Sequence, residues 1–104
     1  MKTKGFSILQ QLAAMRDMIQ NMEHDLGIDS LTPNERDILL AFYANARTDA
    51  ENRTVCSTDV VRAHPTVSRI SQPTFHRTLR KLVQQGLVIN DKSLPAGVYV
   101  IPTE

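Results

Sequence analysis

The chain has 104 residues, of which 41% are hydrophobic and 22% charged, the balance of an ordinary globular domain. A single cysteine excludes an intrachain disulfide and a cysteine-rich zinc module, and no apolar run approaches the roughly 20 residues that span a bilayer. The net charge of +1 divides unevenly: residues 1–52 hold five basic and eight acidic side chains, and residues 53–104 hold seven basic and three acidic ones. The basic second half favours a polyanionic partner.

A long amphipathic helix is predicted first, from about residue 7 to residue 26. Its apolar residues alternate three and four positions apart, a spacing that keeps one seam facing a partner helix, and Gly27 is placed to end the helix. This seam predicts a dimer interface formed by Ile8, Leu12, Met15, Ile19, Met22 and Leu26. The alternative is that the stripe packs on the chain's own domain, and the two interpretations are compatible.

A second helix begins at Thr32-Pro33-Asn34-Glu35, which fits a capping box with proline at the first helical position. We expect its apolar face to consist of Ile38, Leu39, Phe42, Tyr43 and Ala46. Residues 47–53 are polar and aperiodic, which predicts a loop. A very short strand is expected at residues 54–55.

Ser57, Thr58 and Asp59 open a predicted third helix with Val60, Val61 and Ala63 as its inner residues, and Pro65 ends it. Val67 and Ile70 are expected to be apolar anchors in the connection that follows.

Ser71 is a predicted N-cap for a fourth helix over residues 72–85, which Gly86 ends. The β-rich runs 87–89 and 98–101 flank a segment rich in turn formers, which predicts a hairpin with a long loop.

The order of these elements is that of a winged helix-turn-helix, and residues 74–88 resemble the recognition helix of MarR-like transcriptional regulators. Thr74, Arg77, Leu82 and the closing Gly86-Leu87-Val88 carry the resemblance, and the start of the second helix, residues 31–35, is similar to the family's as well. The resemblance implies a mainly α fold with a small β-hairpin wing. Residues 1–28 would then form an N-terminal dimerisation helix, and residues 29–104 a winged helix-turn-helix domain that binds DNA.

Three features depart from the family pattern. The connection between the third and fourth helices is longer than usual. The hairpin loop has one lysine and no arginine, whereas the family's wings commonly carry an arginine for the minor groove. The family's C-terminal dimerisation helices have no counterpart in these residues, so the resemblance places dimerisation on the first helix.

The fourth helix can be analysed without the family. At 100° per residue, Phe75, Leu79 and Leu82 share one face, while Arg77 lies opposite them with Arg80 and Lys81 on either side. Side chains near the N-terminal turn of such a helix approach base edges, and hydroxyls and helix N-termini bind phosphates. The predicted DNA-binding residues are therefore Ser57, Ser71, Gln72, Thr74, His76, Arg77, Arg80, Lys81 and Lys92. The alternative is a solvated basic face.

The remaining residues do not indicate a metal site, a reactive thiol or a catalytic site. The three histidines lie on different elements without ligand spacing, so we expect no metal and no cofactor. Cys56 precedes a helix N-terminus, where nearby Arg53 would help to stabilise a thiolate, but a buried inert thiol is the preferred interpretation over a redox sensor. No phosphate loop, nucleophile elbow or paired carboxylate set is present, so an enzyme is not expected.

These features predict a cytoplasmic, dimeric regulator that binds double-stranded DNA in a sequence-specific manner, with the helix 72–85 in the major groove. The alternative is a winged-helix module that binds an acidic protein without direct DNA readout. No membrane partner is expected, because no apolar run is long enough to span a bilayer. The cytoplasmic location is expected because the beginning of the sequence turns polar too soon for a signal peptide. The sequence does not identify an operator or a small-molecule effector.

Overall fold

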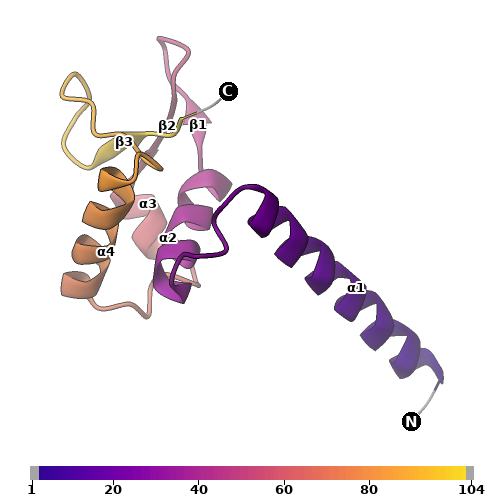
Figure 1. Ribbon diagram of the computed structural model, residues 1–104. Coiled ribbons are helices and arrows are strands. Elements are labelled where there is room, and N and C mark those ends of the chain that lie inside the picture. The colour runs from indigo at the N-terminus through magenta and orange to yellow at the C-terminus, as the bar shows by residue number, and fades with distance from the viewer. Residues whose placement is uncertain (1–2, 103–104) are drawn as a thin grey trace. The chain divides into compact units, whose positions relative to one another are not determined.

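The computed structural model describes residues 3–102, and the chain divides into two compact units, Met1–Leu31 and Thr32–Glu104. The described residues form four helices and a small three-stranded antiparallel sheet, so the fold is mixed α and β (Figure 1). In chain order the elements are α1 (Thr3–Asp25), α2 (Pro33–Ala44), β1 (Arg47–Thr48), β2 (Thr54–Ser57), α3 (Thr58–Ala63), α4 (Gln72–Gln84) and β3 (Val98–Val100).

The first unit consists of α1 and the turn that ends it. The helix begins four residues before the predicted start at residue 7, because serine at that position is tolerated inside a helix and nothing there forces a boundary. Its predicted end is confirmed. Gly27 has a φ of +74°, its N–H donates to the carbonyl of His24, and the N–H of Ile28 donates to the carbonyl of Glu23. This pair of bonds satisfies the last carbonyls of the helix.

The predicted capping box of α2 is confirmed. The Glu35 N–H donates to Oγ1 of Thr32 at 3.2 Å, and the Thr32 N–H donates to Oε1 of Glu35 at 2.8 Å. That backbone bond is the main reason why the pKa of Glu35 lies below its ordinary value of 4.5, although the residue is only 7% exposed. The box sets the start of a helix whose inner face is largely as predicted.

Ile38, Leu39 and Phe42 on α2 are buried, as expected. Tyr43 and Ala46 were wrongly included in this face. Tyr43 is exposed and donates from its hydroxyl to the carbonyl of Pro102 at 3.4 Å, and Ala46 is half-buried beyond the end of the helix. The helix ends at residue 44, so the helical periodicity no longer applies to Ala46.

The prediction of a loop over residues 47–53 was wrong at its start, because β1 pairs with β2 in antiparallel register. Arg47 lies opposite Val55, and Thr48 lies opposite Thr54. The turn between them is closed by Asp49, whose Oδ1 accepts the N–H groups of Glu51 and Arg53 at 3.0 and 2.8 Å. A strand of two polar residues has no periodicity to detect, so the turn chemistry was the only available signal.

The predicted hairpin between residues 87–89 and 98–101 was also wrong in extent. With residues 87–89, β3 makes a single bridge, from Val100 to Ile89. Its main partner is β2, which extends to Ser57 and pairs with β3 over three residues, Ser57 lying opposite Val98. The sheet order β1-β2-β3 therefore joins segments about 40 residues apart, and local patterns do not encode such a pairing.

The helices α3 and α4 are capped at their N-termini as predicted. The Ser57 and Ser71 hydroxyls accept the N–H groups of Val60 and Thr74, both at 3.4 Å. Of the predicted inner residues of α3, Val61 is buried, whereas Val60 and Ala63 are exposed. A helix of six residues turns fewer than two times and presents little inner surface.

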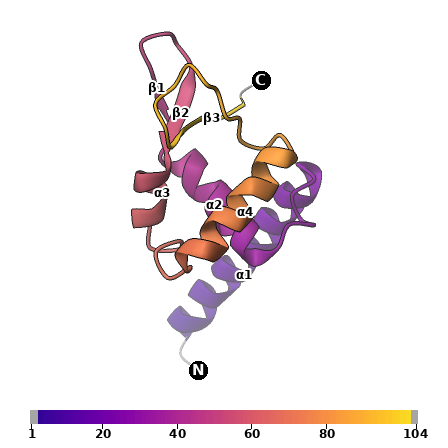
Figure 2. The ribbon, with the colours of Figure 1, turned by 90° about the vertical axis from the view of Figure 1, so that its left-hand side faces the viewer.

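The core of the second unit lies between α2, α3, α4 and the sheet. Val67 and Ile70 anchor the connection before α4 as predicted, and Gly86, with a φ of +75°, ends α4. The α4 helix lies along one face of this unit, turned toward the viewer in Figure 2. The largest fully buried side chains of this core are Phe42, Phe75, Ile38, Leu82, Ile101, Val55, Val61, Val67, Val88 and Cys56.

Candidate nucleic-acid interface

The α4 helix has the two faces that the sequence predicted. Phe75, Leu79 and Leu82 are buried, and the structure adds Thr78 to this inner face. The outer face carries the exposed side chains of Arg77, Arg80 and Lys81, with exposed His76 and half-buried Thr74 at its edges. Gln72 is exposed at the first turn of the helix, on the side of the buried face. Burial of the first face forces the charged side chains of the second into solvent, because the two sets are on opposite sides of one helix.

The N-terminal turn of α4 positions Arg77. Ser71 donates from its hydroxyl to Oγ1 of Thr74 at 2.9 Å, and Nη2 of Arg77 donates to the same oxygen at 3.2 Å. This chain of bonds holds the arginine along the outer face. The Ser71 hydroxyl is already engaged as the helix cap, so a phosphate near this turn would meet the backbone N–H groups more readily than the hydroxyl.

The cations of α4 differ in their surroundings. Within the part of the chain that the structure describes, neither Arg77 nor Arg80 forms an ion pair. Lys81 lies close enough to Glu35 to contribute, as the smallest of four causes, to the pKa of that carboxyl. Among the three cations of α4, Arg77 and Arg80 are therefore the ones whose charge is least compensated by described residues.

Phe75, near the N-terminus of α4, makes a cation–π contact with α3 that was not predicted from the sequence. The guanidinium carbon of Arg62, in the last turn of α3, lies 5.0 Å from the centroid of the Phe75 ring. The His76 ring meets the same phenyl ring edge-on, at 5.5 Å and 82°. The contact of Arg62 with Phe75 joins α3 to α4, whereas His76 and Phe75 are neighbours on α4 itself. An arginine at the end of a short helix gives no sequence signal for such a role.

Two predicted phosphate contacts lie on other elements. Ser57 caps α3 and lies in β2 opposite Val98, and its hydroxyl is occupied by the capping bond. Lys92 is exposed in the loop that leads to β3, between Asp91 and Ser93. Neither residue has a contact with α4 among the described interactions, so the structure gathers seven of the nine predicted residues at α4 and its cap.

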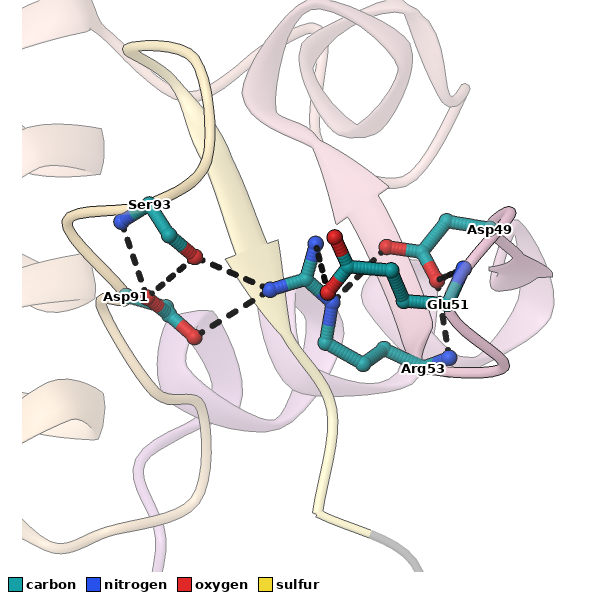
Figure 3. A network of polar contacts seen from close by, with 5 residues as sticks. All are labelled: Asp49, Glu51, Arg53, Asp91 and Ser93. Carbon is teal, nitrogen blue, oxygen red and sulfur yellow. Dashed lines mark hydrogen bonds and ion pairs between the residues drawn. The ribbon is translucent and has the colours of Figure 1, made fainter.

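Arg53 is the centre of a polar network that was not predicted from the sequence (Figure 3). Its Nε lies 2.9 Å from Oδ2 of Asp49, its Nη1 lies 2.9 Å from Oγ of Ser93 and 3.4 Å from Oδ2 of Asp91, and its Nη2 lies 3.5 Å from Oε2 of Glu51. Asp49, by its side-chain hydrogen bond, is the main reason why the pKa of Arg53 is raised. The guanidinium is thus committed to carboxylates and does not serve Cys56.

The network leaves the two loops without net positive charge. Three carboxylates, those of Asp49, Glu51 and Asp91, surround Arg53, and Lys92 is the other cation in these loops. The pKa of Asp49 is lowered chiefly by the backbone N–H of Arg53, and that of Asp91 by the backbone N–H of Ser93. Both carboxylates are therefore held in their charged form, which reduces the attraction of this edge for phosphates.

Cys56 is 1% exposed, and burial raises the pKa of its thiol above the ordinary value of 9.0. Its Sγ–H donates weakly to the carbonyl of Ser57 at 3.6 Å. A thiolate is disfavoured in such surroundings, which supports the interpretation as an inert core residue. Over residues 3–102 the structure holds no group of three or more His, Cys, Asp or Glu side chains arranged to bind a metal ion, and no helix there is long and apolar enough to cross a membrane.

A cleft of about 340 Å³ opens beside the basic face, between one flank of α4 and the sheet. It is lined by His76, Leu79, Arg80, Val83, Asn90 and Tyr99. Asn90 and Tyr99 were not among the site residues predicted from the sequence. Asn90 follows the predicted strand 87–89, and Tyr99 lies within the predicted strand 98–101. The pairing of β3 with β2 is what brings Tyr99 beside α4.

Comparison with known proteins gives no family for this chain: no family model, no curated protein and no solved structure matches it. A proposal of function therefore depends on the chain's own residues and geometry.

Proposed function

We propose that this protein is a dimeric, sequence-specific regulator that binds double-stranded DNA through a winged helix-turn-helix, with α4 in the major groove. The observation that carries the proposal is the outer face of α4, where Arg77 and Arg80 are exposed and form no ion pair among the described residues. Two neighbouring guanidinium groups without carboxylate partners are free to bind phosphates or base acceptors, which match their planar donors.

The arrangement of elements supports this proposal. A short helix, a connection and a capped second helix are followed by a loop that returns to a small antiparallel sheet, which is the order of a winged helix-turn-helix. In this assignment the loop over residues 90–97 is the wing. Its charge is weak, so we assign most of the affinity to α4 and little to the wing.

The roles on α4 follow from position. Arg77, held by Thr74 at the centre of the outer face, is suited to bind the two acceptors of a guanine. Gln72, Thr74 and His76 would meet neighbouring base edges. Arg80, Lys81 and Lys92 would contact the sugar-phosphate backbone with their side chains, which sets position rather than sequence. Ser57 and Ser71, whose hydroxyls are engaged as helix caps, would do so through the backbone N–H groups of the turns that they cap.

Dimerisation is proposed to occur through α1, which has 23 residues and spans about 34 Å. Each of the six seam residues is at least half exposed in the single chain: Ile8, Leu12, Met15, Ile19, Met22 and Leu26. Most helical stability in proteins comes from packing of an apolar face, and burial of the seam against a second copy would contribute about 1 kcal/mol per half-exposed side chain. Two copies would then present two α4 helices to two half-sites.

Selection from a random duplex pool tests the proposal directly. The purified chain is incubated with the pool at fixed salt, bound duplexes are recovered, and enriched sequences are read after several rounds. We expect enrichment of a two-fold symmetric site containing guanine in each half. Recovery of unenriched sequences, with no duplex bound more tightly than a scrambled one, would contradict specific DNA binding.

A second function is favoured by one observation, the acidic surroundings of Arg53. The carboxylates of Asp49, Glu51 and Asp91 lie in the loops that a DNA-binding wing would bring to the duplex. Such a surface suits a module that binds another protein, in which the basic α4 meets an acidic partner. Failure of the selection experiment together with capture of a defined acidic protein by α4 would favour this function instead.

A further inference from the structure

The cleft between α4 and the sheet combines a cation with neutral donors in one open cavity. Arg80 and His76 come from one flank of α4, and Asn90 and Tyr99 come from the region around β3. Leu79 and Val83 form its apolar floor. The volume of about 340 Å³ accommodates a phosphodiester together with its flanking sugars.

The polar groups of this cleft are not used by the protein. Across residues 3–102, the side chains of Arg80, Asn90 and Tyr99 make no hydrogen bond or ion pair. The Tyr99 ring is nevertheless fixed, because it packs edge-on against Phe42 with centroids 6.0 Å apart. A pre-positioned ring beside an unpaired guanidinium costs little entropy on binding a ligand.

The positive charge of Arg80 favours an anionic ligand in this cleft. Arg80 is a permanent cation whose planar donors match a phosphate, and among the described residues no acidic side chain lines the cavity. His76 and Asn90 add N–H donors, and Tyr99 adds an O–H donor. An oxyanion is the chemistry that satisfies all four at once.

We infer that this cleft holds a backbone phosphate of the bound duplex, with Arg80 as the cation and Asn90 and Tyr99 as hydrogen-bond donors. The inference rests on the proposed DNA binding and adds two residues to it. It also assigns Arg80 to the backbone, in contrast to Arg77, which points away from the protein on the central line of the outer face. In this arrangement the cleft sets the depth and angle of α4 in the groove.

Uncharged phosphate analogues test the inference with the full chain. A selected duplex is prepared in versions that each carry one methylphosphonate, and the affinity of each is measured by fluorescence anisotropy. We expect the wild-type protein to lose about tenfold in affinity at one phosphate of each half-site, the effect of removing a charge-assisted hydrogen bond. In the Arg80→Ala variant, the loss at that position should disappear and the salt slope should fall by about 1.

Two further variants separate the cleft from general electrostatics. Tyr99→Phe keeps the ring against Phe42 and removes only the hydroxyl, so it should weaken binding to selected and scrambled duplexes by the same small factor, about threefold. Arg16→Ala removes one exposed cation from α1, outside the cleft, and should leave the methylphosphonate pattern unchanged.

Each other outcome overturns the inference in a recognisable way. If Arg80→Ala keeps the wild-type pattern and Tyr99→Phe binds normally, the phosphate is held elsewhere while DNA binding itself stands. If Arg80→Ala changes the preferred sequence, Arg80 reads a base. If inorganic phosphate shifts the NMR signals of Asn90 and Tyr99 but the duplex does not, the cleft serves a free anion. If no duplex is bound selectively by the wild type, the proposed function fails and this inference with it.

Discussion

Nη1 of Arg53 lies 2.9 Å from Oγ of Ser93, although 40 residues separate the two in the chain. The same guanidinium lies 2.9 Å from Asp49 through Nε, so one side chain joins the β1–β2 turn to the loop before β3 (Figure 3). The pairing of β2 with β3 makes this contact possible, because it brings the two loops to the same edge of the sheet. The carboxylates of this network give the protein a defined acid response.

We predict that Asp49→Asn reduces the loss of stability on acidification. The pKa of Asp49 is lowered below its ordinary value of 3.8, chiefly by the backbone N–H of Arg53. A carboxyl with a depressed pKa contributes stability that is fully present above 3.8 and is lost as the pH falls through the folded-state value. Urea unfolding of the wild type between about pH 5 and pH 3 should therefore show a steeper decline than the variant does. Asp17→Asn, an exposed change on α1, is the control, and parallel curves for wild type and Asp49→Asn would refute the prediction.

Ile19→Glu should separate the proposed dimer. The substitution places two carboxylates in the centre of the α1 seam, where burial of an unpaired charge is strongly unfavourable. We expect the dimer dissociation constant, measured by sedimentation equilibrium, to rise at least about 100-fold. Gln20→Glu is the matched control, because it adds the same charge beside the seam. Sedimentation of the unmodified chain as a monomer at tens of micromolar, about the middle of the usual affinity range, would end the proposal of an α1 dimer.

Arg77→Ala and Lys92→Ala should weaken DNA binding in different ways. A bidentate arginine contributes about 1–3 kcal/mol of discrimination at one base pair, so its loss should abolish the preference for the selected duplex over one changed at that position. Lys92 lies in a loop with Asp91 and would contact only phosphate, so its loss should weaken both duplexes alike. Titrations of both variants against both duplexes measure this difference. Equal losses on the two duplexes for both variants would mean that Arg77 is an electrostatic contact only.

Phe75→Ala should destabilise the second unit by about 3–5 kcal/mol, the usual range for deleting a fully buried phenyl ring. The loss includes the contact of the ring with Arg62, which joins α4 to α3. The free energy of unfolding from urea titration measures the effect. Phe6→Ala, at an exposed position of α1, should change it by no more than about 0.5 kcal/mol. A similar cost for both variants would show that Phe75 is not a central core residue.

Local chemistry was sufficient to predict the helices. The capping box at Thr32, the cap at Ser71 and the glycine at position 86 act within a few residues of themselves, and all three have the predicted geometry. The two faces of α4 follow from a period of 3.6 residues, so the exposure of Arg77 opposite Phe75 could be predicted as well. The candidate basic face was therefore available from the sequence.

The sheet, the Arg53 network and the cleft depend on contacts between segments that are distant in sequence. The short strands β1 and β3 have no periodicity of their own, and their partners in β2 lie far away in sequence or across a polar turn. The commitment of Arg53 to Asp49, Asp91 and Ser93 depends on that pairing, as does the cleft that Tyr99 and Asn90 complete with Arg80. Helix ends and faces are determined by interactions between near neighbours, which a single sequence displays. Sheet register and the contact between two loops depend on which distant segments bury their apolar surface together. That pairing is visible only in the folded structure.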